Sequence, residues 1–341
     1  MSKRELNILF TCVGRRVALI DCFRRAMAEL GLTGRCLATD ITSTSPAFHK
    51  ADKGFIAPSV NSVNYTPAVL EIAEKNRAGL LVPLTDLDLR VLARHRERYA
   101  KVGCTVMVAS EPTIVLCRDK VKTFRMMRDG GLATIVTFSL EEFMERPFYP
   151  CFVKPVRGSG GFGASVVHTS KQMRAHIATF GEQLLVQEYV PGQEFTIDVY
   201  RTRDRQVRCV VPRQRLAVRS GEVEKGVTVR DEPLVQAVIK LSGLLDDLWG
   251  VFCCQCRRMD GPGAEPRFFE VNPRFGGGAP LSIAAGADLV LYLLQEVTGK
   301  RVTARLGRFR GGLLMLRYEQ AVFVPVRDPQ DLPGYRTPVF R

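Results

Sequence analysis

Apolar and polar residues follow two different periods along the first third of the chain. Short runs that are apolar almost throughout predict buried β-strands, at residues 6–13, 34–41, 80–86 and 104–110. Segments whose apolar residues recur every three or four positions predict helices, at residues 15–31, 65–79 and 87–103. Strands that alternate with helices in this way are typical of a parallel sheet with helices on its faces. We therefore expect a small α/β unit at the start of the chain.

The pattern changes after residue 110. A helical period at 111–132 is followed by strand patterns around a glycine-rich turn, and then by a longer ladder of strands. The predicted strands lie at 149–158, 162–170 and, in several pieces, 183–215; the predicted helices lie at 172–181, 232–249 and 279–299. Strands grouped together with helices beside them are typical of an α+β domain.

The length of 341 residues suggests two or three packed units. We expect a Rossmann-like unit at 1–110, a larger domain at 111–300 with a smaller lobe at 125–190, and a C-terminal strand and tail at 301–341. Only Gly14 follows the first predicted strand, where a dinucleotide-binding loop needs three spaced glycines. A nicotinamide cofactor is therefore not expected.

Composition is that of an ordinary globular protein, with 46% hydrophobic and 25% charged residues. No apolar run approaches the roughly 18 residues that span a bilayer. The first residues lack the long apolar core of a signal peptide, so we expect a cytoplasmic protein with no membrane partner. The ten cysteines are scattered, and the group at 253, 254 and 256 lacks the paired spacing of a zinc site, so buried reduced thiols are expected.

The formal net charge of +14 fits either a nucleic-acid surface or a cleft for phosphorylated ligands. Basic residues are spread along the whole chain, and no zinc-finger or RNA-recognition pattern is present. We therefore expect solvated helix faces with a contribution from a polyphosphate site, and do not expect nucleic acid as a partner.

A glycine-rich stretch at 154–165, KPVRGSGGFGAS, is the first candidate binding site. Its glycines allow backbone amides to close around an anion. Three common phosphate loops do not match: the stretch lacks a Gly-Lys-Ser/Thr end, Lys154 precedes the loop, and a strand pattern follows it. A hairpin that covers phosphates, with Lys154 on its incoming strand, is the interpretation that remains beside a plain glycine turn.

A second candidate is RFFEVNPRFGGG at 267–278, because Glu, Asn and Pro are unusual in a strand core. Alternation along a strand points Glu270 and Asn272 to the same side. Two such oxygen ligands suit Mg²⁺ when phosphate oxygens complete its shell, and Gln255 on the preceding strand could add a third. Arg274 could then bind a phosphoryl or carboxylate oxygen. A capped strand end is the alternative.

A third candidate is the strand end in QEYVPGQEFTIDVY, residues 187–200. Adenine can pair with backbone groups along such an exposed edge, while a carboxylate holds the ribose hydroxyls. Alone, the stretch also fits an ordinary hairpin with exposed acids. The coincidence of three sites with phosphate or metal chemistry favours the functional interpretation of each.

Taken together, these motifs resemble the ATP-grasp superfamily, and more narrowly the carbamoyl-phosphate-synthase large-subunit-like proteins and the pyrrolysine-pathway ligases. The resemblance runs from ILFTCVGRRVALI and LATDITSTSPAFHKADKGF through CRDKVKTFRMMRDGGL and FVKPVRGSGGFGAS to FFEVNPRFGGGAPLSIAAG. Its most specific element is the Glu-x-Asn-Pro-Arg of the last segment. It implies a Rossmann-like pre-ATP-grasp domain followed by a two-lobed ATP-grasp domain, an α/β and α+β architecture.

The resemblance also implies ATP with Mg²⁺, or Mn²⁺ in its place, and assigns roles to matching positions. Lys120 and Lys154 would contact the α- and β-phosphates, and Arg274 the γ-phosphate and the acyl phosphate. Glu270, Asn272 and Gln255 would bind the metal. The glycine-rich loop 158–163 would fold over the triphosphate as a flap, Glu188 and Val190 would flank adenine, and Glu194 would bind the ribose. The full set of these nucleotide contacts, with a closing loop included, is Gly158, Ser159, Gly160, Gly161, Gly163, Glu188, Tyr189, Val190, Glu194 and Lys225. The same loop, 213–229, would add Arg213 and Arg215, with Arg219 as a catalytic candidate.

In such enzymes a carboxylate attacks the γ-phosphate of ATP, and an amine displaces phosphate from the acylphosphate. We therefore expect a carboxylate–amine ligase for small molecules, in amino-acid-derived or specialised metabolism, with a homodimer as the family's usual state. One alternative is carbamoyl-phosphate-type chemistry on bicarbonate, which the lack of duplicated synthase halves disfavours. Another is a nucleotide- or nucleic-acid-binding regulator without turnover, which the intact Glu270, Asn272 and Arg274 disfavour.

Overall fold

The computed structural model describes residues 4–156, 161–219, 221–261, 263–328 and 332, and the chain divides into two compact units. One unit comprises Met1–Val108, Val290–Val302 and Tyr318–Arg341; the other comprises Ala109–Leu289 and Thr303–Arg317. Within the described ranges, no helix combines the length and the apolar character that crossing a bilayer requires.

The first unit is built on a five-stranded parallel sheet in the order β3-β2-β1-β4-β5. Its strands are β1 (Asn7–Thr11), β2 (Cys36–Asp40), β3 (Lys53–Ile56), β4 (Ala78–Pro83) and β5 (Thr105–Val106). Its helices include α1 (Val17–Glu29), α2 (Pro46–Lys50), α3 (Tyr65–Lys75) and α4 (Leu89–Lys101). Every residue of β1 is buried, as in a parallel strand covered on both faces. The expected α/β unit is confirmed, although the sequence pattern missed the short α2 and β3.

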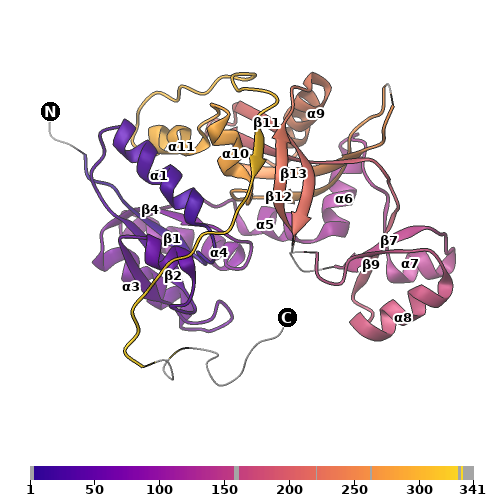
Figure 1. The fold of residues 1–341 in the computed structure, drawn as a ribbon, viewed down its shortest axis with the longest axis horizontal. Helices are drawn as coiled ribbons and strands as arrows, with labels where there is room; N and C mark the ends of the chain where they lie inside the picture. Colours follow the sequence, from indigo (N-terminus) through magenta and orange to yellow (C-terminus); the bar gives the residue numbers. More distant parts are fainter. Residues whose placement is uncertain (1–3, 157–160, 220, 262, 329–331, 333–341) are drawn as a thin grey trace. The chain divides into compact units, whose positions relative to one another are not determined.

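A four-stranded antiparallel sheet forms a small lobe of the second unit, in the order β6-β9-β7-β8. Its elements are β6 (Thr137–Ser139), α7 (Leu140–Glu145), β7 (Cys151–Pro155), β8 (Ser165–Val167), α8 (Ser170–Phe180) and β9 (Leu184–Glu188). Figure 1 shows α7 and α8 beside this sheet. Side chains from both helices and three strands share one buried cluster, which includes Phe143, Val153, Met173 and Val186.

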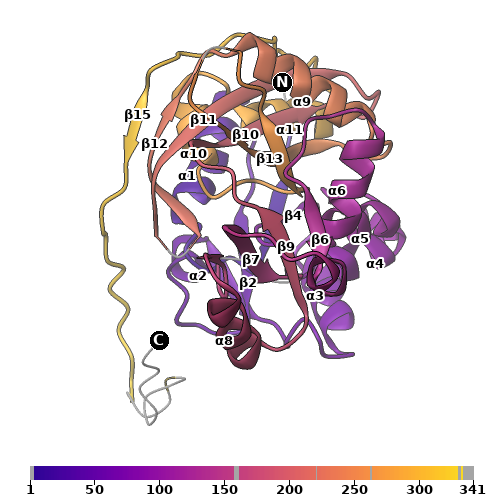
Figure 2. The same ribbon diagram turned by 90° about the vertical axis from the view of Figure 1, so that its right-hand side faces the viewer.

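A six-stranded antiparallel sheet forms the rest of this unit, in the order β14-β13-β10-β11-β12-β15. The strands are β10 (Gln193–Arg201), β11 (Val207–Arg219), β12 (Glu222–Thr228), β13 (Gly250–Arg258), β14 (Arg267–Asn272) and β15 (Leu314–Leu316). Beside it are α5 (Glu111–Arg118), α6 (Lys120–Asp129), α9 (Glu232–Gly243) and α10 (Ala279–Ala284), and α11 (Leu289–Val297) follows α10 in the chain. Figure 2 shows β15, which follows the other strands in the sequence, beside β12 at the sheet edge.

Two helices that the periodicity predicts as continuous are each broken in two. The segment 111–132 changes direction at Asp119, whose carboxylate accepts hydrogen bonds from the amides of Val121 and Lys122, both at 3.1 Å, and so caps α6. The segment 279–299 divides into α10 and α11 around Gly286, whose φ of +95° cannot continue a helix. Hydrophobic periodicity continues through both breaks, which is why it did not reveal them.

Two connections differ from what the sequence allowed or predicted. The ordinary hairpin that was the alternative for residues 187–200 is absent, because β9 belongs to the four-stranded sheet and β10 to the six-stranded one. The stretch 213–229 is not a loop, because β11 and β12 pair as an antiparallel hairpin through most of it. The chain between Glu188 and Gln193 therefore crosses from one sheet to the other.

The core of the small lobe depends on Phe143. This side chain is 1% exposed and makes edge-to-face contacts with Phe148 and Tyr149, at ring-centroid distances of 5.4 and 5.8 Å. Phe143→Ala should lower the free energy of unfolding by about 3–5 kcal/mol, because it leaves a cavity in that core. Met144→Ala is the control, since Met144 is 54% exposed and its loss should cost less than about 0.5 kcal/mol. Urea denaturation measures both; equal effects would contradict the assigned packing.

Candidate active site

Polar side chains form a stripe along one face of the six-stranded sheet. In β10, the apolar residues Phe195, Ile197 and Val199 are buried and alternate with Thr196 and Asp198. Backbone register continues the polar stripe sideways: Thr196 pairs with Gln255, which in turn pairs with Glu270. In the next row, Asp198 pairs with Cys253, which pairs with Asn272. The alternation of β10, β13 and β14 therefore gathers these groups from segments that are far apart in the sequence.

Glu270, Asn272 and Arg274 make a connected group at the end of β14. The amide Nδ2 of Asn272 donates to Glu270 Oε1 at 3.0 Å, and Arg274 Nη2 donates to Asn272 Oδ1 at 3.2 Å. Arg274 Nη1 also donates to the carbonyl oxygen of Phe275 at 3.1 Å. The predicted arrangement, with Glu270 and Asn272 on one side of the strand, agrees with these contacts.

Lys154 of β7 is a buried cation in the small lobe. Its side chain is 8% exposed, and its Nζ lies 5.0 Å from the ring centroid of Phe269. Burial lowers the Lys154 pKa to about 8, and the positive charge of Lys120 lowers it further, while the negative charges of Glu270 and Glu194 oppose the shift. Four elements, β7, α6, β14 and β10, thus bring their charged groups into one electrostatic neighbourhood.

Lys120 reaches this neighbourhood because it is the first residue of α6. The capped break at Asp119 starts the helix there, and the N-terminal end of a helix carries partial positive charge. A lysine at this end adds its own charge to that of the helix. The position suits an anion, such as a phosphate.

Glu194, the predicted ribose ligand, is already paired with two arginines. Arg215 Nε lies 3.1 Å from Glu194 Oε1, and Arg257 Nη2 donates to Glu194 Oε2 at 3.2 Å. Arg215 also donates to Thr196 Oγ1 at 3.2 Å and to the carbonyl oxygen of Gly221 at 3.0 Å. The Glu194 carboxylate, 24% exposed, therefore connects β10 with the tip of the β11–β12 hairpin.

The predicted adenine residues occupy the crossing between the two sheets. The Glu188 carboxylate accepts a hydrogen bond from Arg267 Nη1 at 2.8 Å and one from the amide of Val136 at 3.1 Å. The carbonyl oxygen of Val190 accepts from Arg257 Nη1 at 2.8 Å. Between them, Tyr189 is 39% exposed. The Glu188 carboxylate is thus used to hold the segment that connects the two sheets. A base bound there would be contacted by backbone groups.

Part of the predicted flap lies outside the described residues, namely Gly158, Ser159 and Gly160. Gly161 and Gly163 both have positive φ, +73° and +66°, which explains the choice of glycine. The carbonyl oxygen of Gly163 lies 3.0 Å from His176 Nε2 of α8. The described end of the flap is thus connected to the small lobe.

Arg219 and Lys225 occupy exposed positions of the β11–β12 hairpin. In the sheet order, β10 and β11 lie between β12 and β13, which puts the β12 backbone roughly 14 Å from that of β13. Backbone pairing does not bring these two residues to the Gln255–Glu270 row, so their assigned roles remain predictions.

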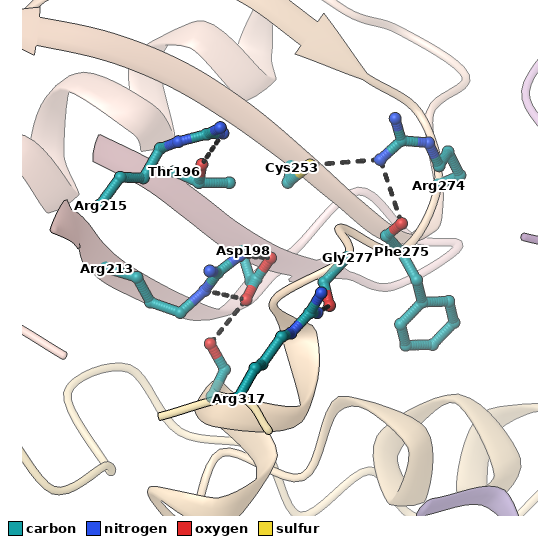
Figure 3. Close-up of polar contacts among 10 residues, drawn as sticks. Thr196, Asp198, Arg213, Arg215, Cys253, Arg274, Phe275, Gly277 and Arg317 are labelled. Carbon is teal, nitrogen blue, oxygen red and sulfur yellow. Dashed lines mark hydrogen bonds and ion pairs between the residues drawn. The ribbon is translucent and has the colours of Figure 1, made fainter. Parts of the chain in front are cut away.

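Four side chains near Arg274 were missed or undervalued in the sequence. Arg213 pairs with Asp198 in the buried interior: Nε donates to Oδ2 at 2.7 Å and Nη2 to Oδ1 at 2.9 Å. Ser282 of α10 also donates to Asp198 Oδ2, at 2.6 Å. Arg317, just after β15, donates to the carbonyl oxygen of Gly277. Figure 3 shows Arg213 facing Asp198, and Arg317 reaching Gly277. The alternation of β10 could have revealed Asp198, but no sequence pattern marks Arg317.

Comparison with known families places this site in context. Residues 8–107 match the family described as PylC-like, N-terminal domain, and residues 120–218 match the D-ala D-ala ligase C-terminus. Residues 180–321 match the family described as ATP-grasp in the biosynthetic pathway with Ter operon. The chain belongs to the ATP-grasp superfamily. The resemblance seen in the sequence is confirmed, and the N-terminal unit of this ATP-grasp protein is PylC-like.

Curated relatives of this ATP-grasp protein include two D-alanine–D-alanine ligases. The Thermotoga petrophila enzyme is 32% identical over 95 residues, which cover 26% of this chain and 30% of the relative. The Bacteroides fragilis enzyme is 28% identical over 198 residues, which cover 51% and 60%. The matched segments thus span less than two thirds of these relatives.

Solved structures share the whole ATP-grasp fold at low identity. The biotin carboxylase domain of Hydrogenobacter thermophilus 2-oxoglutarate carboxylase has a TM-score of 0.71 at 17% identity, over 90% of this chain and 73% of that one. N5-carboxyaminoimidazole ribonucleotide synthetase from Thermus thermophilus has a TM-score of 0.68 at 18% identity, over 88% and 80%. The L-amino acid ligase of Bacillus licheniformis has a TM-score of 0.66 at 19% identity, over 87% and 75%. The expected fold class is confirmed.

Membership in this superfamily implies ATP and a divalent metal ion. Gln255, Glu270 and Asn272 offer one carboxylate and two amide oxygens in adjacent positions, a donor set that suits a hard cation. Among the described residues, no cluster of three or more His, Cys, Asp or Glu side chains could bind a metal by itself. The donor set therefore fits a cation that takes its remaining ligands from the nucleotide phosphates.

The depressed pKa of Lys154 makes nucleotide binding sensitive to pH. Phosphate anions favour the charged ammonium, so MgADP should raise the Lys154 pKa above its value of about 8 in the free protein. MgADP binding should then take up a fraction of a proton at about pH 8.5. At about pH 6.5 it should take up little, because Lys154 is already protonated. The affinity should fall as the pH rises above 8. Calorimetry in two buffers with different ionisation enthalpies measures this uptake.

Lys154→Arg is the matched control for this measurement, because arginine stays protonated at either pH. The variant should bind MgADP without the extra proton. Equal proton uptake by both proteins would show that another group titrates.

Proposed function

We propose that this chain is an ATP-dependent ligase that joins a small carboxylate to an amine, with Mg²⁺ or Mn²⁺ as the metal ion. The observation that carries the proposal is the convergence of charged groups from four elements: the buried Lys154 lies within the electrostatic influence of Lys120, Glu270 and Glu194, and Glu270 lies in a row with Gln255 and beside Asn272. Two buried or half-buried lysines and a group of oxygen ligands suit a metal-bound triphosphate.

The chain's own cations would support phosphoryl transfer. Lys120 and Lys154 would hold the α- and β-phosphates, and Arg274 would contact the γ-phosphate, where charge develops. The divalent cation, held by Gln255, Glu270 and Asn272, would neutralise phosphate charge when bound. Such pre-positioned charges are the main contribution of a protein to this kind of transfer.

The proposed reaction has two chemical steps. A carboxylate oxygen forms a bond to the γ-phosphorus as the bond to the bridging oxygen breaks, which gives an acylphosphate and ADP. The amine then forms a bond to the acyl carbon, phosphate leaves with the electron pair of the C–O bond, and the amine loses a proton. No protein nucleophile takes part in either step.

The names of the relatives suggest which substrates to test first. D-alanine–D-alanine ligases and an L-amino acid ligase are among the proteins that this chain resembles. Amino acids are therefore the first carboxylates and amines to supply. Bicarbonate is a second choice, because the Hydrogenobacter domain was solved with bicarbonate and MgADP.

ADP release should depend on the substrate pair and on the site. We expect the protein to release ADP from MgATP only when a suitable pair is present, in a pairwise screen of amino acids with bicarbonate plus ammonia as a further arm. Glu270→Ala should reduce that release at least about a hundredfold, the size expected when a group that stabilises transferring charge is removed. Glu182→Ala, in an exposed turn, should leave the rate unchanged.

The outcomes separate the alternatives. Undiminished release by a Lys154→Ala, Glu270→Ala double variant would refute the site. Release with bicarbonate alone would favour carboxyphosphate chemistry. A protein that releases no ADP but binds nucleic acid, with the same salt dependence before and after Glu270→Ala, would be a regulator.

A further inference from the structure

A buried ion pair lies directly beneath the three glycines at 276–278, which we call the glycine segment. The side chains of Asp198 and Arg213 are 0% and 1% exposed and make two parallel hydrogen bonds. Burying two charges costs free energy that is recovered only if their geometry and hydrogen bonds are good. An apolar pair would avoid this cost, so we expect the buried ion pair to have a specific role.

The backbone of the glycine segment touches this pair. A Cβ atom on Gly278 would lie 2.2 Å from Arg213 Nη1, and one on Gly276 would lie 3.1 Å from Asp198 Oδ1. A Cβ atom on Gly278 would overlap Arg213, whereas one on Gly276 would fit only if its neighbours moved by a few tenths of an ångström, so the ion pair explains glycine most directly at position 278. Arg213 Nη1, which makes no hydrogen bond among the described residues, faces Gly278.

Two further side chains hold the same segment. Ser282 donates to Asp198 at 2.6 Å and so connects the pair to α10, the helix that begins directly after the segment. From the other end of the sheet, Arg317 donates to the carbonyl oxygen of Gly277, and its Nη1 lies 3.6 Å from Glu222 Oε2. Figure 3 shows Asp198, Arg213 and Arg317 close to Gly277.

Arg274 depends on this backbone for its position. Its guanidinium donates to the carbonyl oxygen of Phe275, one residue before the glycine segment, and Phe275 is 1% exposed. Cys253 Sγ lies 3.9 Å from Arg274 Nη1 and would lie 3.2 Å from a Cβ on Gly276. Arg274 Nη2 also donates to Asn272 Oδ1 of β14, at 3.2 Å, so a displacement of the glycine segment would disturb the contacts with Phe275 and Cys253 but not the contact with Asn272.

We propose that the Asp198–Arg213 pair and Arg317 are positioning residues, which clamp the glycine segment from two sides and thereby hold Arg274 where the transferred phosphoryl group passes. The inference rests on the role proposed above for Arg274. The clamp acts through the backbone, so it should matter for the transition state and not for binding of the nucleotide itself.

Binding of a phosphoryl-transfer mimic tests the clamp without knowledge of the natural substrates. MgADP alone does not fill the γ-phosphate position, whereas MgADP with fluoroaluminate does. The gain in affinity on adding fluoroaluminate therefore reports contacts to the transferring group. We expect wild type to show this gain and Arg274→Ala to lose it.

Gly278→Ala and Arg317→Met should each reduce the gain at least tenfold, while the Kd for MgADP stays within twofold of wild type. Arg317 is 37% exposed, so its replacement should not unfold the chain, and thermal denaturation checks this for both variants. Arg317→Lys should recover part of the gain, because it keeps a donor and the charge. Arg125→Met, which removes an exposed arginine 3.4 Å from Glu142, should behave as wild type.

Three results would overturn the inference. Gly278→Ala and Arg317→Met that keep the wild-type gain would show that the clamp does not position Arg274. If these two variants bind MgADP more weakly but keep the gain from fluoroaluminate, the residues have a general structural role and do not act on Arg274. If wild type shows no gain, or Arg274→Ala keeps it, the role proposed for Arg274 fails, and the inference falls with it.

Discussion

Charges on the polar face of the six-stranded sheet are held by opposite charges and not by bulk water. Asp198 is paired with Arg213 at no measurable exposure, and Glu194 is paired with both Arg215 and Arg257. A buried charge without a partner costs several kcal/mol, so Asp198 and Arg213 each require the other for the fold, whereas the partly exposed Glu194 depends less on its partners. The direction in which each carboxylate points is therefore set before any ligand arrives.

Several further arginines of this sheet are paired with carboxylates in the same way. Arg258, Arg267 and Arg317 also lie on or next to strands of this sheet and are paired with Asp231, Glu188 and Glu222. Arginine suits such places because its planar group can bind two acceptors at once and stays charged when partly buried. Each of these ion pairs contributes no net charge, so the formal net charge of +14 comes from the other basic residues of the chain.

Local sequence patterns predicted the features that follow from the alternation of side chains along one strand. Glu270 and Asn272 were predicted to share a side of β14, and their hydrogen bond agrees with that. The parallel sheet followed from its apolar runs in the same way. Local patterns did not predict contacts between distant segments or the exact ends of helices. Asp119 separates two helices although the apolar period continues through it, and Arg317 binds Gly277, which lies forty positions earlier. No local period records such a contact, because only the folded sheet brings the two together.

The route of the chain has a consequence for how the protein can be divided. The chain passes between the two units four times, after residues 108, 289, 302 and 317, because the segment that ends in β15 returns to the six-stranded sheet. A fragment cut at 300 would keep every oxygen ligand of the proposed metal site but would lose an edge strand and Arg317. To express the second unit alone, residues 303–317 would therefore have to be joined to residues 109–289 in a new order or through a new linker.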